Sequence, residues 1–193
     1  INSIEKFQNS DVLKQQPVIW HKAKNFNIFD DKNNKWIDFS STIFVANSGH
    51  ANLKIVKSIQ KNASRLLHAY SYPTIERLNY LKKLIKFVPS YFNSATLLNS
   101  GTEAAERAIK ISKLYGNKFK NKKKIIVGNL GNYHGKTMGS AILSGGRNDS
   151  DWIGYKDPNI FRLKFPYPWL IKKDLTGKKL FLEDLKILKK KKL

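Results

Sequence analysis

The feature that most constrains this chain is a short apolar segment that leads directly into a turn and then into a helical pattern. Residues 95–98 are apolar and short enough for a buried strand. A Ser-Gly-Thr turn follows at residues 100–102, and residues 102–115 have helical periodicity that we expect to stop at Gly116. A strand that leads at once into a helix is typical of α/β folds with a parallel sheet. We therefore expect an α/β fold of this kind.

The start of this helix has the chemistry of an anion-binding site. Gly101 allows a sharp turn and a close approach by a ligand. The first N–H groups of a helix have no partner within it, and with the helix dipole they attract a phosphate. The hydroxyl group of Thr102 would be a further donor, and Glu103 would have to point away. Alternatively, Ser100 or Thr102 only caps the helix, and this segment alone leaves both interpretations open.

A second polar segment is expected at the same edge of the sheet. Residues 124–127 are typical of a strand, and a glycine-rich loop follows at residues 128–139. Open α/β sheets bind ligands at the edge where the carboxyl ends of their strands meet. Tyr133 in this loop could stack on a flat heterocycle, although a tyrosine packed within an ordered loop is the alternative.

The other segments of the chain predict further short helices, strands and loops. A helix that starts at Thr74 is expected to end at Pro89. We further expect a loose helix or arm at residues 1–16, short strands around a turn at 17–39, a loop at 40–52, a helix at 53–67, mostly loop at 140–158 and a strand at 160–163.

The formal net charge of +22 has two explanations. It could mark a surface for nucleic acid or an anionic membrane, for which residues 118–124 and 189–192 are candidates. It could also be compositional drift, because 31 of the 36 basic residues are Lys and only 5 are Arg. Proteins that bind nucleic acid usually use Arg for bidentate contacts. We therefore favour drift over a nucleic-acid role.

Several classes of protein are excluded by what the sequence lacks. There is no Cys, so disulfides, thiolate metal sites and cysteine nucleophiles are ruled out. The four His residues have no metal-ligand spacing, and we expect no metal. No apolar run approaches the roughly 18 residues of a membrane helix. The first residues lack the apolar core of a signal peptide, and we expect a cytoplasmic protein.

The two polar segments, in this order and spacing, resemble class III pyridoxal-phosphate-dependent aminotransferases, the family of ornithine and 4-aminobutyrate aminotransferases. Residues 99–106, Asn-Ser-Gly-Thr-Glu-Ala-Ala-Glu, are similar to that family's phosphate loop. Residues 133–137, Tyr-His-Gly-Lys-Thr, are similar to its aromatic-His-Gly-Arg-Thr segment. Residues 26–39 match its early hairpin, and residues 47–50, Asn-Ser-Gly-His, also agree. The resemblance extends over residues 17–168 and so covers most of the chain.

The resemblance implies the fold type I architecture with pyridoxal 5'-phosphate as cofactor. Its phosphate would be held by residues Ser100, Gly101 and Thr102, chiefly through backbone N–H groups. Tyr133 would stack on the pyridine ring, and His134 would lie beside it. The resemblance therefore implies that these five residues bind the cofactor.

Two further residues correspond to substrate-binding positions. Lys136 lies where many members carry an Arg that binds a substrate carboxylate, and Lys supplies the charge without the bidentate geometry. Ile43 lies where ornithine aminotransferases carry a pocket Tyr, and an apolar residue there resembles the 4-aminobutyrate group. The alternatives are a solvated surface Lys and a core Ile.

The resemblance also implies a domain organisation. Residues 1–52 would be a small-domain segment with a hairpin and a loop, and residues 53–193 an incomplete cofactor-binding large domain. The family's Schiff-base Lys, and the Asp that pairs with the pyridine nitrogen, would match positions near or beyond Leu193. No Lys of this chain has the matching context. We therefore expect an N-terminal portion with no catalytic residue of its own, which does not transaminate alone.

The implied activity is transfer of an amino group from an amino acid or ω-amine to a keto acid. It would run as a ping-pong reaction in a homodimer. Aminomutases and decarboxylases of the same fold share the phosphate loop, and Lys136 argues mildly against an aminomutase. An alternative of another class is a basic nucleic-acid-binding protein, whose affinity would fall steeply with salt.

Overall fold

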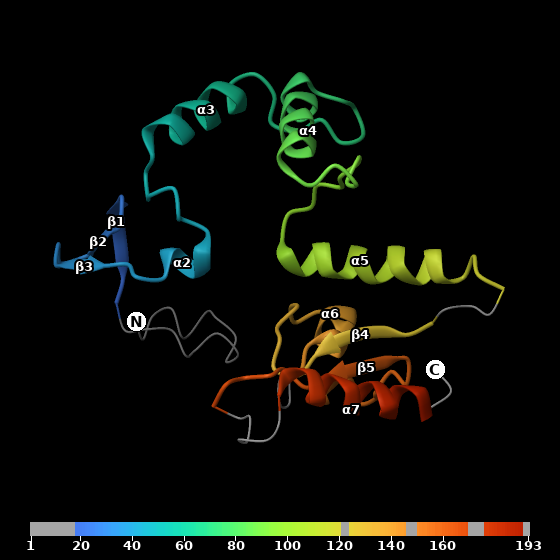
Figure 1. Ribbon diagram of the computed structural model, residues 1–193. Helices are drawn as coiled ribbons and strands as arrows, with labels where there is room; N and C mark the ends of the chain where they lie inside the picture. Colours follow the sequence, from blue (N-terminus) through green and yellow to red (C-terminus); the bar gives the residue numbers. More distant parts are fainter. Residues whose placement is uncertain (1–17, 121–123, 146–149, 170–175, 191–193) are drawn as a thin grey trace. The chain divides into compact units, whose positions relative to one another are not determined.

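The computed structural model describes residues 18–120, 124–145, 150–169 and 176–190. The chain divides within a helix into two compact units, Ile1–Leu84 and Ile85–Leu193. The first unit holds a small antiparallel sheet followed by helices, and the second holds a parallel strand pair with helices (Figure 1). The predicted α/β class is confirmed. The arm expected at residues 1–16 lies outside the described residues, and none of the helices in the described ranges could span a bilayer.

The first unit begins with a three-stranded antiparallel sheet in the order β1-β2-β3. Its strands are β1 (Trp20–Lys24), β2 (Asn27–Asp30) and β3 (Lys35–Ile37). Ile28 on the central strand is 2% exposed. Asp30 closes the turn before β3, because its carboxylate accepts hydrogen bonds from the N–H groups of Lys32 (3.0 Å) and Asn34 (2.7 Å). The strands and turn predicted within residues 17–39 are confirmed.

Helices follow this sheet: α2 (Ser41–Phe44), α3 (Leu53–Ala63) and α4 (Ile75–Phe87). α3 begins after Asn52, whose side chain accepts a hydrogen bond from the Lys54 N–H at 3.1 Å, and it ends short of the predicted residue 67. α4 begins after Thr74, whose hydroxyl accepts a hydrogen bond from the Arg77 N–H at 3.2 Å. The predicted cap and the end of α4 before Pro89 are therefore confirmed.

The second unit combines helices with the parallel strands β4 and β5, which pair from Ile126 opposite Ile160 to Asn129 opposite Leu163. Its elements are α5 (Gly101–Gly116), β4 (Ile126–Asn129), α6 (Met138–Leu143), the 3₁₀ turn η2 (Asp151–Ile153), β5 (Ile160–Leu163) and α7 (Gly177–Lys190). α5 contacts α6, and α7 contacts β5. The helix predicted at residues 102–115 and the strand at 160–163 are confirmed, and β4 begins two residues later than predicted.

Two charged side chains tie helices of this unit to β5 and its end. Arg162 donates a hydrogen bond from Nε to the Ser144 carbonyl at 3.1 Å and another from Nη2 to the Ile142 carbonyl. Its charge therefore lies at the carbonyl end of α6, where the helix dipole favours a cation. Asp184 on α7 is 2% exposed, and it accepts a hydrogen bond from the Lys164 N–H at 2.7 Å. Its other oxygen lies 3.5 Å from the Lys164 Nζ.

One prediction for the second unit is wrong. Residues 95–98 form no strand, and Leu97 and Leu98 are 45% and 43% exposed. An apolar run becomes a strand only where another strand satisfies its N–H and C=O groups, and no described strand pairs with it. Residues 140–158, expected as mostly loop, also contain η2 and the last part of α6, and the other described residues of this range are loop. Contacts from distant residues stabilise α6, and its own sequence gives only a weak helical signal.

Candidate functional site

The candidate anion site lies at the start of α5. Ser100 is the N-cap in an extended conformation, and its Oγ accepts a hydrogen bond from the Glu103 N–H at 3.2 Å. The capping role that the sequence left open is therefore present. Within the described residues, the N–H groups of Gly101 and Thr102 have no hydrogen-bond partner. Two donors at the positive end of the helix dipole thus remain available.

The space at this helix start fits a phosphate group, whereas the Glu103 carboxylate does not point away as the sequence analysis required. A β-carbon built on Gly101 would meet no atom within 4 Å, so the approach to the free N–H groups is open. Glu103 is the acidic residue of the first turn, and its carboxylate lies 3.2 Å from the Ser100 hydroxyl, which donates to it. Thr102, which would supply a hydroxyl group, is partly exposed. These donors could hold the phosphate of a cofactor.

Gly135 brings the second polar segment against the first. Its φ angle is +129°, and a β-carbon built on it would lie 2.4 Å from Thr102 Oγ1 and 2.7 Å from Ser140 Oγ. Only a glycine fits this approach, because any side chain would overlap the threonine. The loop that contains Tyr133 is therefore packed at the start of α5.

Tyr133, His134 and Lys136 lie on the loop between β4 and α6. Tyr133 is 66% exposed, so its ring is accessible for stacking and is not packed within the loop. His134 is anchored twice: its N–H donates to Ser144 Oγ at 2.9 Å, and its Nε2 lies 2.7 Å from Asn132 Nδ2. The side chain of Lys136 is exposed. The loop thus has a fixed backbone near His134 and an accessible aromatic ring next to it.

Glu106 is a contact residue that sequence reasoning missed. Its Oε1 accepts hydrogen bonds from the Thr137 hydroxyl at 2.5 Å and from the Ser140 N–H at 2.8 Å, so α5 binds the first turn of α6. The sequence places residue 106 only at the end of the segment that resembles the family's phosphate loop. The available signal was the position of Glu106 in the same motif as Ser100.

Ile43 belongs to the first unit, whereas the other predicted site residues belong to the second. It lies in α2, whose four residues have φ angles from 49° to 68° and so form a left-handed turn. Left-handed backbone costs L-residues roughly 1–2 kcal/mol each. The Ile43 side chain is 80% exposed, so the structure does not support a core role for it.

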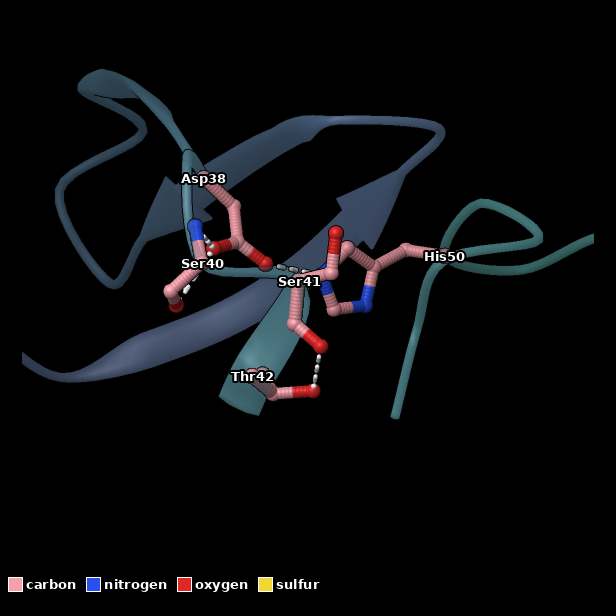
Figure 2. Close-up of polar contacts among 5 residues, drawn as sticks. All are labelled: Asp38, Ser40, Ser41, Thr42 and His50. Atoms are coloured by element: carbon pink, nitrogen blue, oxygen red, sulfur yellow. Dashed lines mark hydrogen bonds and ion pairs between the residues drawn. The ribbon is translucent and has the colours of Figure 1, made fainter. Parts of the chain in front are cut away.

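Asp38 and His50 form a hydrogen-bonded pair beside this left-handed turn (Figure 2). His50 Nε2 lies 2.9 Å from Asp38 Oδ2, and Asp38 Oδ1 accepts hydrogen bonds from the N–H and the hydroxyl of Ser40, each at 2.9 Å. The hydrogen bond with His50 is the largest cause that lowers the pKa of Asp38, and together with the Ser40 bonds it outweighs the opposing effect of burial. The backbone of His50 also pairs with Asn25, so the pair anchors both ends of the segment that carries Ile43.

The family is identified by a sequence profile. The profile described as "Aminotransferase class-III" matches residues 9–193. The chain therefore belongs to the class-III aminotransferase family, as the Ser-Gly-Thr and Tyr-His-Gly segments predicted.

Characterised relatives match the chain over part of their length. Ornithine aminotransferase of Saccharomyces cerevisiae is 34% identical over 145 residues, which are 69% of this chain and 32% of that protein. Leucine/methionine racemase of Thermococcus litoralis is 32% identical over 142 residues, which are 72% of this chain and 31% of that protein. The chain thus spans about a third of the length of these relatives.

Solved structures share the fold. The ornithine aminotransferase from Toxoplasma gondii ME49 has a TM-score of 0.77 at 18% identity, over 86% of this chain and 39% of that chain. This likeness shows the fold. The predicted fold type I architecture is therefore confirmed, and this chain contains a part of it.

Proposed function

We propose that this chain provides the phosphate-binding part of a pyridoxal-phosphate-dependent aminotransferase. The enzyme would transfer an amino group from an amino acid or ω-amine to a keto acid. The observation that carries this proposal is the open start of α5, where the N–H groups of Gly101 and Thr102 lie free beside the loop of Tyr133. When bound, pyridoxal 5'-phosphate supplies an electron sink that stabilises negative charge on the reacting carbon.

In this proposal, residues of the second unit bind and orient the cofactor. The N–H groups of Gly101 and Thr102 and the Thr102 hydroxyl bind its phosphate, and Ser100 fixes the first turn that presents them. Tyr133 stacks on its ring, and His134 lies beside the ring. The close packing of the loop against Thr102 supports this assignment, because both groups then act on one ligand.

A substrate-binding role is proposed for two residues, each on the ground of the family resemblance. Lys136 supplies a positive charge for a carboxylate, and Ile43 an apolar wall. We further propose that residues 1–52 belong to a small domain and residues 53–193 to a large domain. No catalytic residue is assigned within this chain. The enzyme is proposed to act as a cytoplasmic homodimer on an amino donor and a keto-acid acceptor.

A half-reaction tests this function. The natural gene product is incubated with pyridoxal phosphate and one amino donor at a time, from a panel of amino acids and ω-amines, without an acceptor. We expect about one equivalent of keto acid or aldehyde per subunit, and continuous turnover only after a keto acid is added. Failure to bind pyridoxal phosphate contradicts the proposal.

The same assay distinguishes a racemase, a function that the Thermococcus litoralis relative favours. A racemase interconverts the two enantiomers of one amino acid without accumulating keto acid. Aminomutases and decarboxylases are distinguished by their products, an isomeric amine or carbon dioxide. A nucleic-acid-binding protein would instead bind oligonucleotides at low salt, with affinity that falls steeply as salt rises.

A further inference from the structure

We propose that Glu106 is a positioning residue for the loop that carries Tyr133. This inference rests on the proposed function, because it assigns Glu106 to the same cofactor site. Glu106 touches neither of the free N–H groups at the start of α5. It acts by fixing the start of α6, and through α6 the loop before it.

The Glu106 carboxylate caps α6 from a neighbouring helix. Thr137 is the N-cap residue of α6, yet its side chain makes no capping hydrogen bond within that helix. Its hydroxyl donates to Glu106 Oε1 instead, and the same oxygen accepts the Ser140 N–H. A carboxylate at a helix N-terminus is favoured by the helix dipole, and hydrogen bonds to a charged group are stronger than neutral ones.

Gly139 provides the space for this contact. A β-carbon built on Gly139 would lie 2.3 Å from Glu106 Oε2 and 3.1 Å from Oε1. A larger residue at this position would therefore displace the carboxylate from the first turn of α6. The Glu106 carboxylate thus occupies the space that a side chain at position 139 would need.

A second contact anchors the opposite end of the loop. Ser144 Oγ accepts the His134 N–H at 2.9 Å and donates to the Ser140 carbonyl at 2.9 Å. Ser140 is fully buried, and it takes part in both anchors. The backbone between His134 and Thr137 is thus held at both ends, and Tyr133 directly precedes this held segment. Loss of the Glu106 anchor should release one end while leaving the other in place.

Hydrogen exchange of the natural gene product tests this role without any cofactor. Glu106→Leu and Gly139→Ala should each raise the exchange rate of the Ser140 N–H, which donates to Glu106, by about 10- to 100-fold, whereas the rate of the His134 N–H, which donates to Ser144, should rise less. Glu106→Gln keeps an acceptor oxygen and should give a smaller increase. Glu183→Gln, an exposed change on α7, is the matched control and should leave these rates unchanged.

A uniform increase that extends through α7 would show general destabilisation and would overturn the proposal, as would an unchanged rate at the Ser140 N–H. If Glu106→Leu fails to fold, Glu106→Gln and Gly139→Ala still decide the question. The reference for all variants is the exchange pattern of the unaltered protein.

Affinity for pyridoxal phosphate separates this inference from the proposed function. Glu106→Gln should weaken binding in the unaltered background, but by less than about twofold when Tyr133→Ala is already present, since coupled residues are non-additive. Equal effects in both backgrounds would overturn the positioning role. If the unaltered protein does not bind pyridoxal phosphate, the proposed function fails, and the exchange rates alone decide the role of Glu106.

Discussion

Gly135 lies against Thr102, so closely that a β-carbon on the glycine would be 2.4 Å from the threonine hydroxyl. The two residues are far apart in the sequence, and each belongs to one of the two polar segments that define the candidate site. Their contact joins the free N–H groups at the start of α5 to the loop that carries Tyr133. The geometry of the site therefore depends on the absence of a side chain at position 135.

Gly135→Ala should destabilise the protein by about 2–4 kcal/mol, because the backbone there is unfavourable for alanine and the added methyl group overlaps Thr102. Gly154→Ala is the matched control. Gly154 has a φ of +77° but no atom within 4 Å of a built β-carbon, so only the backbone cost of about 1–2 kcal/mol applies. Urea denaturation measures both. Equal losses for the two variants would show that the contact with Thr102 contributes nothing.

Substitutions of Ser100 separate capping from phosphate binding. Asn is as good as Ser at an N-cap, so Ser100→Asn should change the free energy of unfolding by less than about 0.5 kcal/mol. Ser100→Asp should destabilise the protein more, because it places a second carboxylate against that of Glu103. The carboxylate of Ser100→Asp would repel a phosphate at the free N–H groups, whereas the neutral amide of Ser100→Asn would not. Titration with pyridoxal phosphate should therefore show weaker binding for Ser100→Asp only. Equal affinities would mean that Ser100 acts solely as a cap.

Gly101→Ala should affect binding without affecting stability. A methyl group at this position meets no protein atom within 4 Å, and alanine is a good helix residue, so the free energy of unfolding should change by less than about 1 kcal/mol. A phosphate that binds the backbone here would be held off by the methyl group, and we expect affinity to fall by about tenfold or more, or about 1.4 kcal/mol. Calorimetric titration alongside urea denaturation provides both numbers. Unchanged affinity would place the phosphate elsewhere.

The Asp38–His50 pair should make stability depend on pH in acid. The folded state lowers the pKa of Asp38 below its ordinary value of 3.8, chiefly through the hydrogen bond with His50. The stabilisation is therefore complete above the ordinary pKa and is lost as the pH falls through the lowered pKa. Asp38→Asn should thus unfold at lower urea concentration than the unaltered protein at pH 7, with a smaller difference at pH 3.

The control for this comparison is Asp31→Asn, which removes an exposed carboxylate that has no side-chain hydrogen bond among the described residues. It should show no such pH-dependent difference. A difference for Asp38→Asn that is equal at both pH values would contradict the role assigned to the pair.

Elements with strong local signals could be predicted from the sequence. The helical periodicity after Ser100 gave α5, the hydroxyl of Thr74 gave the start of α4, and the apolar residues 160–163 gave β5. Capping and periodicity depend only on residues within an element or directly beside it, so these elements can be recognised from their own sequence. The Ser-Gly-Thr turn likewise predicted the free N–H groups at the start of α5.

Features that depend on distant residues could not be predicted in this way. α6 is short and contains Gly139, and it is held by Glu106 at one end and by Arg162 at the other. The left-handed turn of α2 contains no glycine, so nothing in its sequence indicates positive φ angles. For residues 95–98 the local pattern was misleading. Their apolar residues predict a strand, but no described strand pairs with them.

A crystal structure of the natural gene product with bound pyridoxal phosphate tests the central claim most directly. We predict that oxygen atoms of the phosphate lie within hydrogen-bond distance, about 2.7–3.2 Å, of the backbone nitrogen atoms of Gly101 and Thr102, with the ring of Tyr133 against the pyridine. A phosphate bound at another place, with both of these N–H groups still free, would contradict the account.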